Sequence, residues 1–179
     1  MLRIISGKLR GKKLLAPPEN ITRPTLDRVR ECLFSTLISM RSLQGSHVVD
    51  AFAGSGAFGI EAYSRGAGHV TFVEHHPAAL KCLKQNLLAL PRDASILVEA
   101  DALKKLQMLQ PIDILFLDPP YNTTLLEQVL NLPLPLNEAA VIVCETLKSK
   151  PLAHPGYALI KEKVLGQVKL LFLQKISED

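Results

Sequence analysis

The stretch that decides the fold is Val48-Val49-Asp50-Ala51-Phe52-Ala53-Gly54-Ser55-Gly56-Ala57-Phe58-Gly59. An apolar run is followed by an acid and a glycine-rich turn, and then by a helical pattern over residues 59–65. This order is typical of a buried strand, a tight turn and a helix in a parallel α/β sheet. Ligands of such sheets bind at the carboxyl ends of the strands, so the turn is a candidate binding site.

The residues after this turn keep the same alternation. Short apolar runs at 70–73, 96–98 and 112–117 are separated by helical patterns at 78–90 and 102–109. Strands that alternate with helices in this way predict a parallel sheet with both faces covered.

The last third of the chain changes character. A helical pattern at 125–130 and a strand at 141–144 precede two apolar runs, 157–164 and 168–173, which meet at Gly166. Two strands linked so tightly must form an antiparallel hairpin. We therefore expect a Rossmann-like α/β fold with a mostly parallel sheet and an antiparallel C-terminal hairpin.

Length and composition favour one domain with a small appendage. The 179 residues are 47% hydrophobic and 21% charged, which is ordinary for a globular protein. We expect a basic N-terminal hairpin or arm over residues 1–24 and one domain over residues 25–179, with its first helix at 25–40.

The sequence contains no apolar run long enough for a membrane span and no signal-peptide core, so we expect a cytoplasmic protein. We also expect it to be a monomer. Three dispersed cysteines predict neither a disulfide framework nor a metal site.

Positive charge is concentrated at the N-terminus. Residues 1–30 carry eight basic and two acidic side chains, a balance of +6 that leaves the rest of the chain at −2 within the net charge of +4. Such a segment suits phosphate contacts with nucleic acid, although the charge alone is equally consistent with a solvated surface. The candidate RNA-binding residues are Arg3, Lys8, Arg10, Lys12, Lys13, Arg23, Arg28 and Arg30.

The glycine turn is compatible with two cofactors. Gly54, Gly56 and Gly59 fit the dinucleotide pattern G-x-G-x-x-G, and Glu74 follows Gly54 by twenty residues. An acid just before the glycines, Asp50, favours S-adenosylmethionine instead. That cofactor has no pyrophosphate for a helix N-terminus, whereas its cationic sulfonium and amino groups suit an acidic turn.

Acids at three consecutive strand ends strengthen this interpretation. Asp50 would serve the cationic end, Glu74 would accept both ribose hydroxyls and Asp101 would accept the adenine amino group. A single such acid is more simply explained as an exposed loop carboxylate. Three together beside a glycine turn indicate a cofactor site. Its candidate residues are Asp50, Phe52, Gly54, Gly56, Glu74, Asp101 and Ala102.

The tetrapeptide Asp118-Pro119-Pro120-Tyr121 carries the candidate catalytic residues. It follows the buried run 112–117, and two prolines lift the chain away from the sheet and leave backbone carbonyls free. Asp118 and the Pro119 carbonyl can then accept the two hydrogens of an exocyclic amine, while the Tyr121 ring can stack on a flat base. Methyl transfer to an aromatic amine needs this positioning, because the nitrogen lone pair is delocalised into the ring.

These motifs support a family resemblance over almost the whole chain. The Asp-Pro-Pro-Tyr motif is similar to motif IV of amino-methyltransferases acting on adenine N6 or guanine N2, and residues 50–56 look like their motif I. Residues 3–11, 22–31 and 61–67 resemble the RsmD-type bacterial methyltransferases of small-subunit (16S) ribosomal RNA. The resemblance implies a seven-stranded class I methyltransferase sheet, S-adenosylmethionine as donor, a guanine N2 as acceptor, and ribosomal RNA or a small-subunit precursor as partner.

Three other functions stay open at this point. An adenine-N6 methyltransferase of RNA or DNA would use the same Asp-Pro-Pro-Tyr motif. An NAD-dependent oxidoreductase would use the glycines and Glu74 but leaves residues 118–121 unexplained. A non-catalytic RNA-binding module would explain the basic arm but not the acids of the cofactor site.

Overall fold

A seven-stranded sheet organises the protein, which we describe from a computed structural model covering residues 2–17, 24–121 and 123–176. Its strand order is β3-β2-β1-β4-β5-β7-β6. Strands β1 to β5 run parallel, and β7 runs antiparallel to both β5 and β6, so the predicted fold class is confirmed. The strands are β1 (His47–Ala51), β2 (His69–Glu74), β3 (Ser95–Glu99), β4 (Ile112–Leu117), β5 (Leu136–Leu147), β6 (Tyr157–Leu165) and β7 (Val168–Lys175).

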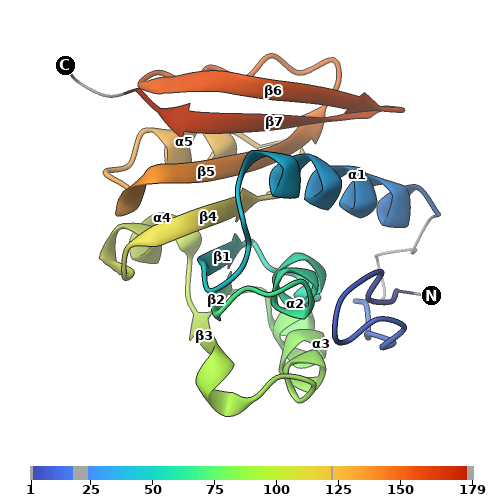
Figure 1. Cartoon of the computed structure of the whole chain (residues 1–179). Coiled ribbons are helices and arrows are strands. Elements are labelled where there is room, and N and C mark those ends of the chain that lie inside the picture. Colours follow the sequence, from blue (N-terminus) through green and yellow to red (C-terminus); the bar gives the residue numbers. More distant parts are fainter. Residues whose placement is uncertain (1, 18–23, 122, 177–179) are drawn as a thin grey trace.

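Helices cover both faces of the sheet. Figure 1 shows α1, α2 and α3 on one side, together with the N-terminal segment, and α4 and α5 on the other. The helix expected at 25–40 is present as α1, whereas the one expected at 102–109 is divided into α4 and a 3₁₀ turn, η2. The helices are α1 (Pro24–Met40), α2 (Ala57–Ser64), α3 (Pro77–Leu87), η1 (Arg92–Ala94), α4 (Ala102–Lys105), η2 (Leu106–Met108) and α5 (Leu125–Leu130).

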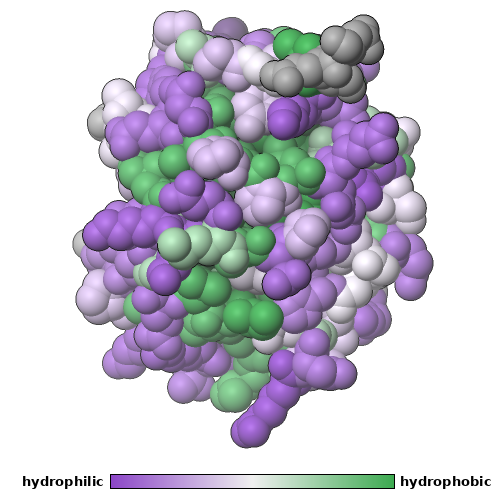
Figure 2. Space-filling model, turned by 90° about the vertical axis from the view of Figure 1, so that its left-hand side faces the viewer, coloured by the Kyte–Doolittle hydropathy of each residue, from purple (hydrophilic) through white to green (hydrophobic). Residues whose placement is uncertain are grey.

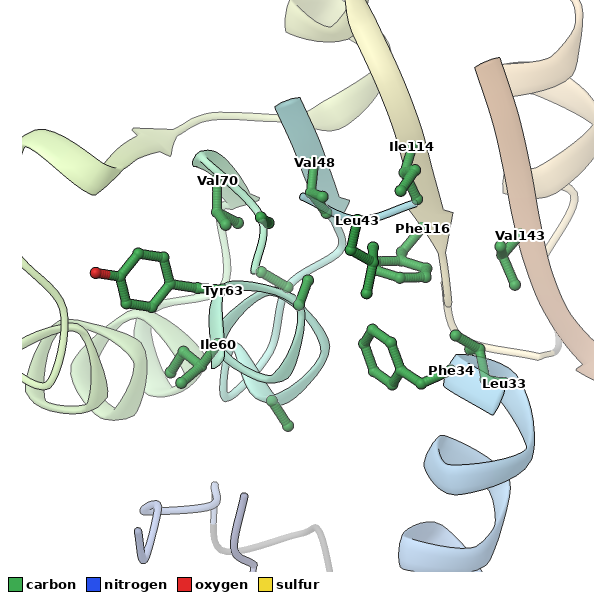
Figure 3. Packing of buried hydrophobic residues seen from close by; sticks show 14 of the residues in the cluster. Leu33, Phe34, Leu43, Val48, Ile60, Tyr63, Val70, Ile114, Phe116 and Val143 are labelled. Atoms are coloured by element: carbon green, nitrogen blue, oxygen red, sulfur yellow. The ribbon is translucent and has the colours of Figure 1, made fainter. Parts of the chain in front are cut away.

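The core lies in two layers because side chains alternate along each strand. Val48 of β1 and Phe116 of β4 belong to the cluster under α1 and α2, while Val49 and Leu115 belong to the cluster under α4 and α5. Phe34 of α1 meets Phe116 edge to face, with ring centroids 5.6 Å apart (Figure 3). The two layers hold the central strands β1 and β4 rigidly. The carboxyl ends of these two strands lead into the candidate site.

The N-terminal segment folds back against α2. Arg3 and Lys13 form an antiparallel bridge, and Leu2 and Ile4 are buried in the same cluster as α1 and α2. A side chain at Gly7 would place its Cβ 1.8 Å from the Ser64 carbonyl oxygen, so the approach requires glycine. The predicted boundary at residue 24 stays a prediction, because residues 18–23 lie outside the described part.

Some large apolar side chains are exposed at the surface. Large exposed apolar side chains include Ile96, Met108 and Leu159. Figure 2 shows apolar surface gathered in a band between hydrophilic residues on the side that faces left in Figure 1. Among the described residues, no helix combines the length and apolar character that a membrane crossing requires.

Candidate active site

The glycine-rich turn joins β1 to α2 through an unusual backbone. Phe52, Gly54 and Gly56 all have positive φ angles, of 63°, 55° and 77°. Glycine adopts such angles freely, whereas the conformation of Phe52 costs on the order of 1–3 kcal/mol of strain. A Cβ at Gly56 would also lie 2.5 Å from Leu83 Cδ1. The turn is therefore closely fitted against α3 and has little freedom to change shape.

Glu74 ends β2 and organises the surrounding backbone. Its Oε2 accepts the Gly54 N–H at 2.8 Å, and its Oε1 accepts the N–H groups of His75 and His76, each at 2.8 Å. The carboxylate is buried and ties the glycine turn to the start of α3. A carboxylate offers about four acceptor positions, so capacity for a further hydrogen bond remains.

Asp50 lies beneath the turn, at the end of β1. Its Oδ2 accepts the Gly59 N–H at 2.8 Å, which fixes the first turn of α2. Burial raises the pKa of Asp50 to about 7, the Gly59 hydrogen bond opposes this shift, and the nearby Glu74 charge adds to it. A cation bound beside these two carboxyl groups would favour their charged forms, so the site fits a positively charged ligand.

Asp101 is the third strand-end acid. It follows β3, and its Oδ1 accepts the Leu103 N–H at 2.9 Å, so that it caps the short helix α4. Ala102 is buried behind it. Because β3, β2 and β1 are neighbours in the sheet, the structure places Asp101, Glu74 and Asp50 along one edge.

The segment from Asp118 to Tyr121 leaves β4, the other neighbour of β1. Leu117, the last residue of β4, pairs with Ala51, so the segment starts beside the glycine turn. Burial raises the pKa of Asp118 well above its ordinary value, and the charges of Glu145 and Asp50 add to the shift. Asp118 is therefore close enough to Asp50 for their charges to interact.

Glu145 is a site residue that sequence reasoning missed. It lies on β5 with 4% of its surface exposed, and the Tyr121 hydroxyl donates to its Oε1 at 2.7 Å. Burial raises the pKa of Glu145, while the bond from Tyr121 opposes the shift. The signal that could have found it is its position directly after the apolar run 141–144, as Asp50 and Glu74 directly follow theirs.

A cavity of about 810 Å³ opens beside Tyr121. Thr123, Gln128 and Lys150 contribute to its wall. The Lys150 ammonium donates to the carbonyl oxygens of Tyr121, at 3.4 Å, and of Thr123. This lysine therefore holds the chain on either side of residue 122, which lies outside the described part.

The basic residues predicted to bind RNA divide into two groups. Arg3, Lys8, Arg10, Lys12, Lys13 and Arg28 are exposed. Arg30 is not: its side chain is 3% exposed, and its guanidinium donates to the Arg3 carbonyl and to Asp27. The prediction for Arg30 is therefore corrected, because a buried guanidinium that anchors the arm cannot reach a phosphate. Arg23 lies outside the described residues.

Two further residues fix the arm relative to the turn. Glu61 of α2 accepts the N–H groups of Ile5 and Ser6, at 2.7 and 3.0 Å. It also pairs with Arg65, an ion pair that their spacing of four residues in a helical pattern predicts. Sequence reasoning found the ion pair but not the bonds to the arm. Asn86 of α3, missed altogether, exchanges hydrogen bonds with the backbone of Leu15 and donates to the Ser55 carbonyl, all at 2.8 Å. One buried amide thus connects the arm to the glycine-rich turn.

Comparison with known proteins agrees with this arrangement. The family model of conserved hypothetical protein 95 matches residues 2–174. A protein named ribosomal RNA small subunit methyltransferase D from Haemophilus influenzae is 40% identical, covering 97% of this chain and 93% of its own. The protein of that name from Escherichia coli K12 is 38% identical, covering 99% and 91%. A solved structure described as "Putative methyltransferase yhhF from Escherichia coli" superposes with a TM-score of 0.84 at 36% identity, covering 97% of each chain.

Proposed function

The chain belongs to the family that includes ribosomal RNA small subunit methyltransferase D, and from this premise we propose that it methylates the exocyclic N2 amine of a guanine in small-subunit (16S) ribosomal RNA, with S-adenosylmethionine as donor. The observation that carries this proposal is the segment from Asp118 to Tyr121, which leaves the strand beside the glycine turn. A cofactor edge and a catalytic segment thus meet at the ends of β1 and β4.

The cofactor would lie along the strand ends. Asp50 faces its cationic end, Glu74 accepts from the ribose and Asp101 from the adenine, while Phe52, Gly54, Gly56 and Ala102 form the surrounding wall. The raised pKa of Asp50, about 7, supports a cationic ligand here. S-adenosylmethionine, when bound, supplies a methyl group on a positively charged sulfur.

The acceptor chemistry falls to the segment after β4. Asp118 and the Pro119 carbonyl accept the two hydrogens of the target amine and orient its nitrogen towards the methyl group. Pro119 and Pro120 keep this backbone away from the sheet, so that its carbonyls stay available. Tyr121 lines the cavity beside the segment and offers its ring to the target base.

The exposed basic residues of the arm support RNA as the substrate. A target base in structured RNA must leave its stack to reach Tyr121, and the phosphates on either side must be held meanwhile. Arg3, Lys8, Arg10, Lys12 and Lys13 lie in a segment that Glu61 and Asn86 anchor next to the cofactor turn. Arg28 extends this charged surface onto α1, and we retain Arg23 in the proposal from the sequence alone.

Two measurements test the proposal. Binding calorimetry should detect S-adenosylmethionine and not NAD, since the acids favour a cation over a pyrophosphate. Radiolabelled methyl groups should then pass to ribosomal RNA from a strain that lacks this protein, and Asp118→Ala should prevent the transfer. Tight binding of NAD, or labelling that survives Asp118→Ala, would contradict it.

A further inference from the structure

We propose that Glu145 is a positioning residue for methyl transfer, which holds the Tyr121 ring in place for the target base through the hydrogen bond to the Tyr121 hydroxyl. This inference rests on the proposed function and adds to it a residue that touches neither the donor nor the reacting nitrogen. Three observations carry it: the contact itself, the burial of the carboxyl group, and the way in which Tyr121 is held at its other end.

The contact is short and enclosed. The oxygen atoms of Tyr121 and Glu145 are 2.7 Å apart, within the ordinary range for a hydroxyl donor. Glu145 lies on β5, where its neighbours Val143 and Cys144 are buried. A carboxyl group in such a place weakens the fold unless its bonds are satisfied, so an apolar residue would serve the sheet better. The bond to Tyr121 gives the carboxyl group a partner at the site.

Tyr121 is held at both ends. Lys150 binds the Tyr121 carbonyl, and Pro119 and Pro120 restrict the backbone before it. With the hydroxyl fixed as well, the side chain has one orientation at the wall of the cavity. Ordering the ring in advance lowers the cost of placing a base against it, and the loss of this order should weaken productive binding roughly five- to tenfold.

Four variants separate positioning from a purely structural role. Glu145→Leu removes the acceptor, Tyr121→Phe removes the donor, the double variant removes both, and Glu145→Gln keeps a neutral acceptor of the same size. Glu138→Gln, at an exposed position of the same strand, is the matched control. Steady-state methyl transfer gives kcat and the KM for RNA, calorimetry gives the affinity for S-adenosylmethionine, and circular dichroism checks the fold.

We expect Glu145→Leu and Tyr121→Phe each to lower kcat/KM for RNA roughly five- to tenfold, with unchanged affinity for S-adenosylmethionine. The double variant should lose no more than either single one, because both remove the same bond. Glu145→Gln should stay within about twofold of the wild type. A double variant whose losses multiply, or a folded Glu145→Leu protein with wild-type kcat/KM, would overturn the proposal.

A second readout does not depend on catalysis. The chain has three tyrosines and no tryptophan, so its tyrosine emission can be followed directly. A tyrosine that donates to a carboxyl group is quenched, so Glu145→Leu should brighten the emission, and this gain should vanish when Tyr121 is already Phe. An unchanged emission would overturn the positioning role even in an active enzyme. The expected emission change in a protein without methyl transfer would contradict the proposed function and leave the contact established.

Discussion

Four carboxyl groups, Asp50, Glu74, Asp118 and Glu145, meet at the carboxyl ends of β1, β2, β4 and β5. Burial raises the pKa of Asp50, Asp118 and Glu145. Such a concentration of acids opposes folding when all are charged, and a cationic ligand such as the proposed donor would reduce the repulsion between them. On the proposed function, the acids that would bind the donor therefore lower the stability of the protein without it.

The first prediction concerns the stability that the folded protein loses when the buried Asp50 is charged. The pKa is raised from 3.8 to about 7, so the folded state holds the proton more tightly than the unfolded chain. Wild-type stability from this group is complete below pH ~4 and falls as the pH rises towards ~7. Relative to the wild type, Asp50→Asn should gain free energy of unfolding across this window, by at most about 4 kcal/mol. Urea denaturation at about pH 4.5 and pH 7.5 measures the difference, and a gain that is the same at both pH values would refute the burial argument.

The second prediction concerns Asp118. Asp118→Ala should cut turnover strongly and leave the affinity for S-adenosylmethionine nearly intact, since we propose that the side chain acts on the acceptor. Single-turnover methylation and calorimetry on one preparation separate the two effects. A folded variant that methylates RNA at the wild-type rate would remove Asp118 from the mechanism.

The third prediction concerns Glu74. Glu74→Ala should weaken S-adenosylmethionine binding by about 1–3 kcal/mol, the range for an unmade hydrogen bond. The structure adds a second cause, because the variant also frees the Gly54 N–H and loosens the turn. Glu99→Ala, an exposed acid at the end of the neighbouring strand, is the control. Equal calorimetric affinities for both variants would count against the assignment.

Single residues show how far sequence reasoning reaches. The positions of Asp50, Glu74 and Asp118 were predictable because each lies at the end of a buried apolar run, whereas Asp101 follows β3, whose side chains are partly exposed. The burial of Arg30 was missed. It lies three and seven residues before Leu33 and Leu37 on α1 and therefore shares their buried face, where its guanidinium donates to the backbone of the arm.

At the scale of elements, the arm, α2, α3 and the glycine turn form one connected unit. Glu61 holds the arm from α2, and Asn86 holds both the arm and the turn from α3. The side chain of Asn86 bonds to the backbone of Ser55, 31 positions away, and of Leu15, 71 positions away. No local sequence pattern encodes contacts over such separations. The parallel direction of β1, β2, β3 and β4, by contrast, was predictable from the alternation of strands and helices.

The fourth prediction tests this unit. Asn86→Ala leaves the Leu15 N–H and the Ser55 carbonyl without their partner, so the free energy of unfolding should fall by about 1–3 kcal/mol. Because Ser55 belongs to the turn, S-adenosylmethionine should also bind more weakly. Asn131→Ala, at an exposed position whose side chain donates to the carbonyl of Glu127 on α5, should change neither quantity. A stable Asn86→Ala protein with normal donor affinity would show that the arm and turn are independent.

At the scale of the whole molecule, charge is divided between an acidic site and a basic arm. The arm lies on the α2 and α3 side of the sheet, away from the β6–β7 hairpin (Figure 1). RNA held by the arm would therefore be presented to a site whose own charge repels phosphate. The net charge of +4 does not reveal this separation. The excess of basic residues in positions 1–30 does indicate it.

The fifth prediction tests the arm as an RNA surface. Replacing Lys8, Arg10, Lys12 and Lys13 by Ala should weaken RNA binding and flatten its dependence on log salt, by roughly one unit for each phosphate that the variant no longer binds. Donor affinity should not change. The control removes equal charge from the C-terminal hairpin, at Lys161, Lys163, Lys169 and Lys175. If both quadruple variants bind RNA alike at every salt concentration, the arm is an ordinary solvated surface.

The measurement that tests the central claim most directly is mass spectrometry of nucleosides from small-subunit ribosomal RNA. RNA from a strain that lacks the protein is incubated with the purified enzyme and S-adenosylmethionine, and then digested. The account predicts the appearance of N2-methylguanosine with the wild type and its absence with Asp118→Ala. The appearance of N6-methyladenosine instead, or of no methylated nucleoside, would contradict it.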